Sequence, residues 1–95
     1  MDFFLKNLTD TLEAINKLID NNINIVNCKR VRRCINIKSS NRSKINFIWR
    51  SLNFLEKNGI LEPNGIVKPK NYKIKNSEKI DIESFIESID RKKKI

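Results

Sequence analysis

The fold is decided by residues 52–62, which read LNFLEKNGILE. Leu52 and Leu55 are three residues apart, the spacing that places two side chains on one face of a helix. Gly59 follows Asn58 at the position of a left-handed C-terminal cap, where glycine takes a positive φ without steric cost. Two aliphatic residues then begin an extended segment. The stretch therefore predicts a helix that ends at Asn58 and a strand that doubles back immediately after it.

The helix before this junction is predicted from about Asn41 to Asn58, with a start anywhere from Ser40 to Lys44 because residues 38–43 are rich in capping side chains. Its inward stripe consists of Ile45, Ile48, Leu52 and Leu55, with Trp49 at the edge. Its polar arc, on the opposite face, consists of Arg42, Ser43, Asn46, Arg50, Asn53 and Lys57. Phe47 and Phe54 border the arc, and we expect them to pack on the first or last helix; a partner surface is the alternative.

Upstream of this helix the sequence predicts two more helices and a short strand. Apolar residues recur at helical spacing from Phe4 onward and predict a long amphipathic first helix that ends at Asp20. Residues 23–25 alternate and predict an edge strand. Asn27 is the expected N-cap of a second helix, from Cys28 to about Asn36. Its expected inward residues are Cys28, Val31, Cys34 and Ile35, and its expected outward residues are Lys29, Arg30 and Arg33.

Downstream, residues 59–62 and 71–75 predict the two strands of a ribbon, with a turn at 63–65. Pro69 favours a loose, extended tip that carries Lys68 and Lys70. A fourth helix is predicted from Asp81, its N-cap, to about residue 93. Its apolar stripe consists of Ile82, Phe85, Ile86 and Ile89. The chain is therefore expected to be one α+β domain, 1–95, with a core over about 8–75.

The positive charge of the chain is concentrated in its middle. The formal net charge is +9 over 95 residues, yet both ends are nearly balanced. Between Asp20 and Glu56 there is no acidic residue, while eight residues are basic. An AT-driven coding bias toward lysine is the plain alternative, but five of those eight are arginine, which forms a better fork for phosphate and guanine than lysine. A polyanion is the partner that this segment predicts.

Several classes of chemistry are disfavoured by composition. The chain has no His and two Cys, at 28 and 34, too few soft ligands for a tetrahedral zinc site, so we expect two buried thiols and no metal or other cofactor. Paired carboxylates in an apolar setting and glycine-rich phosphate loops are missing from the sequence, and we expect a protein that is not an enzyme. The N-terminal residues suggest neither a signal peptide nor a membrane span, and we expect a cytoplasmic, nucleoid-associated protein.

The order helix, short strand, helix, helix, two-stranded ribbon, helix resembles the winged helix-turn-helix DNA-binding superfamily, in particular small regulators or chromatin proteins of the archaeal or mobile-element type. Residues 52–62 look like the family's junction between recognition helix and wing, and the resemblance covers roughly residues 8–75. The connection between the second and third helices, 36–40, is longer than the turn usual in the family.

The resemblance implies that the third helix lies in the major groove of double-stranded DNA and that the ribbon touches the backbone beside it. The residues it assigns to base reading are Arg42, Ser43, Asn46 and Arg50, because Arg suits guanine and Asn suits adenine. The residues it assigns to phosphate are Lys29, Arg30, Arg33, Lys38 and Lys44, with Lys68, Lys70 and Lys73 on the wing.

Three functions stay open on the sequence alone. The first is a transcriptional regulator that reads a specific site. The second is an architectural or chromatin-type protein with low sequence specificity, for which the net charge and the Lys-rich tail suffice. The third is a winged-helix module that binds protein through Phe47 and Phe54. We expect a homodimer through the N-terminal and C-terminal helices; alternatively, both apolar stripes close over the core of one monomer.

Overall fold

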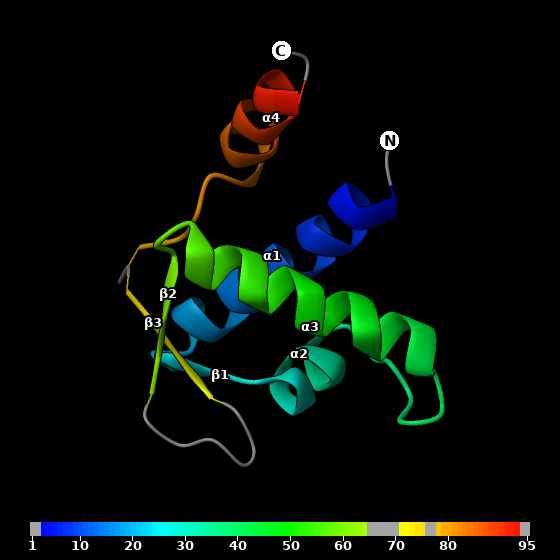
Figure 1. Ribbon diagram of the computed structural model, residues 1–95. Coiled ribbons are helices and arrows are strands. Elements are labelled where there is room, and N and C mark those ends of the chain that lie inside the picture. The colour runs from blue at the N-terminus through cyan, green and yellow to red at the C-terminus, as the bar shows by residue number, and fades with distance from the viewer. Residues whose placement is uncertain (1–2, 65–70, 76–77, 94–95) are drawn as a thin grey trace.

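Four helices and three short strands make up the part of the chain that the computed structural model describes, residues 3–64, 71–75 and 78–93. The elements are α1 (Phe3–Asp20), β1 (Ile25–Val26), α2 (Cys28–Cys34), α3 (Arg42–Lys57), β2 (Leu61–Pro63), β3 (Tyr72–Ile74) and α4 (Ile82–Lys93). In Figure 1, α3 crosses the front of the molecule with α1 behind it, and the strands lie at one end. The α+β class and the order of elements are as predicted.

The sheet has three antiparallel strands in the order β1-β3-β2. The predicted two-stranded ribbon is therefore present, but β1 pairs with it as a third strand. Residues 25 and 26 pair with 73 and 72, and residues 61–63 pair with 74–72. β1 is an edge strand as predicted, but it begins two residues later than expected. Asn22 has a φ of 60° in the turn after α1, and the Ile23 amide still donates to the Leu18 carbonyl at 2.9 Å. The chain therefore becomes extended only beyond this turn.

The helix boundaries follow from side-chain caps and one backbone conformation. Asn27 Oδ1 accepts from the Arg30 amide at 2.8 Å, which confirms the predicted N-cap of α2. Asn41 Oδ1 accepts from the Lys44 amide at 3.2 Å, so α3 begins at Arg42, within the predicted interval. The predicted end of α2 at Asn36 is wrong by two residues, because Asn36 adopts a left-handed φ of 59° that a helix cannot contain.

Asp81 caps α4 as predicted, since its Oδ1 accepts from the Ser84 amide at 3.2 Å. The junction at Gly59 also has the predicted geometry, with a φ of +78°. The Gly59 amide donates to the Glu56 carbonyl at 3.2 Å, and the next amide reaches back to the Leu55 carbonyl at 3.0 Å. This glycine therefore ends α3 and directs the chain into β2.

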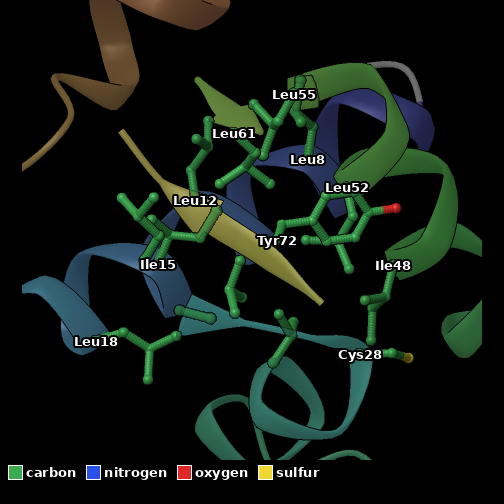
Figure 2. Close-up of a cluster of buried hydrophobic side chains, with 14 of the residues drawn as sticks. Leu8, Leu12, Ile15, Leu18, Cys28, Ile48, Leu52, Leu55, Leu61 and Tyr72 are labelled. Atoms are coloured by element: carbon green, nitrogen blue, oxygen red, sulfur yellow. The ribbon is translucent and has the colours of Figure 1, made fainter. Parts of the chain in front are cut away.

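The core lies where α1 crosses α3 above the sheet, and Figure 2 shows its leucines and isoleucines around the ring of Tyr72. Its largest fully buried side chains include Leu8, Leu12, Ile15, Ile48, Leu52, Leu55, Leu61 and Tyr72. The inward stripe of α3 was predicted with two errors. Ile45 is only half-buried, and Ser51 is buried because its Oγ donates to the Phe47 carbonyl at 2.8 Å. A serine whose hydroxyl bonds to a carbonyl of its own helix can face the core, so its polar character does not indicate an exposed position.

The phenylalanine rings beside the polar arc pack as predicted on the first and last helices. Phe47 stacks with Phe3 of α1, with ring centroids 6.4 Å apart. Phe54 meets Phe4 edge-on at 5.4 Å and Phe85 of α4 at 6.5 Å. The last helix is thereby held against both α1 and α3, and Ile89 on the same helix is buried.

Candidate nucleic-acid interface

The polar arc of α3 is a continuous exposed surface. All six of its residues are exposed, and the buried residues of the helix, Ile48, Ser51, Leu52 and Leu55, lie on the other side. Arg42 and Ser43 occupy the first two positions of the helix. The predicted base-reading residues Arg42, Ser43, Asn46 and Arg50 therefore share one open face, and the structure describes no carboxylate on it.

Arg50 is oriented by the ring beside it. Its guanidinium carbon lies 5.6 Å from the centroid of Phe47, the geometry of a cation–π contact. The side chain stays exposed, so its donors face solvent along the arc. Phe47, which stacks with Phe3 of α1, therefore restricts where this guanidinium can lie.

The predicted phosphate-binding residues of α2 divide into two kinds. Lys29 and Arg33 are exposed, as is Lys38 in the connection to α3. Arg30 is half-buried instead of pointing outward, and its Nη1 donates to the carbonyl of Ile25 at 2.8 Å. Because one arm of this guanidinium joins α2 to β1, Arg30 has a structural role that its helical position did not predict.

Lys44, which the sequence predicts as a phosphate contact, is directed toward α1. Its Nζ forms an ion pair with Asp10 Oδ2 at 2.7 Å and also donates to Asn7 Oδ1. The Lys44 side chain is only 18% exposed, and Asn7 is buried on α1. Ser43 before it is exposed, but one residue further, at 100° per residue, the Lys44 side chain faces α1. It joins the two longest helices, and its charge already has a partner within the protein.

The root of the β2–β3 hairpin is tied to both helices behind the candidate surface. The Tyr72 hydroxyl donates to Asn53 Oδ1 at 2.7 Å, and Asn27 Nδ2 donates to Asn71 Oδ1 at 2.8 Å. Sequence reasoning missed both contacts, because asparagine is common throughout this chain and its pairing partners lie far away in sequence. Lys73 on β3 is exposed, and its Nζ lies 4.0 Å from Oε1 of Glu62. The other predicted wing residues, Lys68 and Lys70, lie outside the described residues.

The two cysteines lie on α2, away from the polar arc of α3. Burial raises the pKa of the Cys28 thiol, although the positive charge of Arg32 acts in the opposite direction. Because the raised pKa keeps this free thiol protonated near neutral pH, Cys28 is a weak nucleophile there. Cys34 is also free, but it is half-buried where a buried thiol was expected. The described residues contain no group of three acidic, Cys or His side chains arranged to hold a metal ion.

Searches against protein-family models, curated proteins and solved structures found no match for this chain. Within the described ranges, no helix combines the length and apolar character needed to cross a membrane.

Proposed function

We propose that this protein is a winged helix-turn-helix transcriptional regulator that binds double-stranded DNA, with α3 as the recognition helix. The observation that carries the proposal is the polar arc: six exposed polar residues, three of them cationic, on one side of a 16-residue helix. An α-helix fits the major groove, and two arginines and two asparagines supply the donors and acceptors that distinguish bases there.

The layout of the elements supports this proposal. α2 packs on α3 immediately upstream, and the β2–β3 hairpin follows α3 directly, with β1 completing the sheet at its edge. In a winged helix the hairpin is the wing and stands beside the recognition helix. The hydrogen bond from Tyr72 to Asn53 fixes the hairpin root against α3 in this protein.

Different roles follow for the exposed basic residues. Arg42, Ser43, Asn46 and Arg50 read bases in the proposed complex, while Lys29, Arg33, Lys38 and Lys73 contact phosphates and set the register. Lys68 and Lys70 are proposed as wing contacts on the sequence alone. Arg30 keeps part of its guanidinium for phosphate, since one of its nitrogens is engaged by Ile25. Lys44 is not included, because Asp10 already neutralises it.

A protein-interaction role through Phe47 and Phe54 has less support than it had from sequence. Phe54 is enclosed by Phe4 and Phe85, and Phe47 is covered in part by Phe3. An architectural DNA-binding role uses the same surface without base discrimination, and it is the alternative that the decisive experiment separates.

That experiment is a fluorescence-anisotropy titration of the protein with random-sequence duplex and with genomic fragments, at about 50 mM and about 200 mM salt. The regulator reading predicts a subset of fragments bound at least 1000-fold, or about 4 kcal/mol, more tightly than random duplex. Equal affinity for every sequence, with a collapse at the higher salt, identifies the architectural role. Absence of binding at the lower salt rejects both DNA-binding roles.

A homodimer is part of the proposal, and the packing favours α4 over α1 as its contact. The apolar stripe of α1 is almost wholly buried in the protein's own core, with Leu8, Leu12 and Ile15 fully covered. On α4, Ile82 and Ile86 are only half-buried and border a hollow of about 400 Å³ with Thr9. Sedimentation equilibrium over a range of protein concentrations measures whether two chains associate.

A further inference from the structure

A second hollow, of about 250 Å³, lies between the N-terminal ends of α1 and α3. Phe3 and Phe47 contribute aromatic rings to its lining, and Lys6, Asn41 and Ser43 contribute polar groups. Phe3 is 75% exposed, the one large apolar side chain exposed to this degree in the described part of the chain. Of these two rings, Phe47 is therefore half-buried, whereas Phe3 is largely open to solvent.

The electrostatics of this hollow favour an anionic occupant. Lys6 is exposed at its edge, and no described carboxylate lines it. Lys44 also lines the hollow, but its charge is paired with Asp10 at 2.7 Å, which leaves Lys6 as the unpaired cation of the described lining. A site with one exposed ring, one half-buried ring and an exposed ammonium suits a ligand that has both apolar carbon and negative charge.

The position of the hollow relative to the polar arc narrows the choice of ligand. Asn53 lies toward one side of the arc and is hydrogen-bonded to Tyr72 of the sheet. Phe47 borders the arc on its other side and stacks with Phe3 of α1. Ser43 belongs both to the arc and to the lining of the hollow. A helix in the major groove, about 12 Å wide, has one sugar–phosphate strand on each side. In the complex proposed above, the sheet side of α3 would therefore face one strand, and the hollow would face the other.

We propose that this hollow seats the second sugar–phosphate strand of the bound duplex, with Phe3 and Phe47 against deoxyribose carbons and Lys6 against a phosphate. This inference rests on the proposed DNA-binding function and adds α1 to the interface. Aromatic rings are well suited to the contact, since they bury apolar area with little loss of side-chain entropy. The site reads no bases, because it touches only the backbone.

The test compares Lys6→Ala and Phe3→Ala with the parent protein in anisotropy titrations of random-sequence duplex over a salt series. Lys17→Ala is the control: it removes one exposed lysine from the same helix, about 16 Å further along α1, where Lys17 Nζ donates to the Cys34 carbonyl at 3.3 Å. We expect Lys6→Ala to reduce the slope of log affinity against log salt by about 1. Phe3→Ala is expected to weaken binding about fivefold with an unchanged slope.

Thermal unfolding of each variant separates binding from folding, and little change is expected for Phe3→Ala because that ring is mostly exposed. If the parent binds duplex and both variants bind as tightly as Lys17→Ala, the hollow is not a DNA contact. If Phe3→Ala changes the sedimentation mass instead of DNA affinity, the hollow is a contact between copies, which also overturns the inference. If the parent itself binds no duplex, the proposed function is what fails.

Discussion

The hydroxyl of Tyr72 donates a 2.7 Å hydrogen bond to Oδ1 of Asn53, which joins the middle strand of the sheet to the polar arc of α3. The Tyr72 ring is fully buried, whereas Asn53 is exposed. The bond therefore runs from the core to the edge of the candidate DNA-binding surface. Together with the Asn27–Asn71 bond, it fixes the root of the hairpin relative to α2 and α3.

Replacing Tyr72 with Phe should weaken this connection without emptying the core. The ring stays and only the hydroxyl is lost, so we expect the free energy of unfolding to fall by about 1 kcal/mol. The loss stays small because Asn53 is exposed and water can take the place of the hydroxyl. Urea unfolding monitored by circular dichroism measures the change.

A double-mutant cycle with Asn53→Ala isolates the pair from other effects of each substitution. The expected coupling energy is at least 0.5 kcal/mol, on the order measured for contacting residues. Strictly additive effects would show that the bond contributes no net stability, and the hairpin root would then depend on strand pairing alone.

Lys44 and Arg33 should respond in opposite ways to truncation. Lys44→Ala removes the partner of Asp10 and of the buried Asn7 amide, and we expect it to lower the free energy of unfolding by about 1–2 kcal/mol. Arg33→Ala removes an exposed charge and should leave stability within about 0.5 kcal/mol of the parent. Urea unfolding of the two variants side by side makes the comparison.

In DNA titrations over a salt series, we expect the larger effect from Arg33→Ala and the smaller effect from Lys44→Ala. Arg33→Ala should reduce the salt slope by about 1, while Lys44→Ala should leave it unchanged once binding is measured well below the unfolding transition. A reduced slope in Lys44→Ala would restore this residue to the phosphate contacts that its sequence position suggested.

The predictable part of this fold is the part with local causes. The cap at Asn27, the left-handed Gly59 and the exposed arc of α3 each depend on residues within one or two helical turns, so spacing and residue type were enough. The packing of Phe47 and Phe54 could also be expected, because apolar rings beside a polar face need a neighbouring helix to cover them.

The unpredicted part depends on partners distant in sequence. Lys44 pairs with Asp10, 34 residues away, and Arg30 reaches a backbone carbonyl that helical periodicity does not represent. The pairing of β1 with the hairpin was not predicted, because a strand of two residues has too short a pattern to indicate its partner. Charge alone does not show that Lys44 and Arg30 have partners within the protein, and only the tertiary contacts identify them.

Cys28 provides a prediction about pH. Burial raises the pKa of its thiol in the folded state, so the unfolded chain loses this proton first as the pH rises. The thiol's contribution to stability is complete below the pKa of an unfolded cysteine, about 8.5, and is lost as the pH rises through the higher folded-state pKa. We expect the free energy of unfolding to fall over the pH interval that begins near the unfolded value, about 8.5, and extends through the higher folded-state pKa.

The measurement is urea unfolding of the reduced protein across this interval, compared with Cys28→Ala. The alanine variant should lose less stability with pH than the parent, while Cys34→Ala keeps the Cys28 thiol and should retain the parent's decline. Parallel curves for the parent and Cys28→Ala would contradict the prediction, since the whole decline would then come from other groups.

Arg50 distinguishes charge from base recognition on the polar arc. If its guanidinium forms a bidentate contact with guanine, Arg50→Lys keeps the charge but loses the fork, and discrimination between the preferred site and random duplex should fall by about 1–3 kcal/mol. The salt slope should hardly change, because one positive charge remains. Lys29→Ala serves as the control, with a lower salt slope and unchanged discrimination. If Arg50→Lys keeps full discrimination, Arg50 contacts backbone only, and base reading on α3 would then rest on Arg42, Ser43 and Asn46.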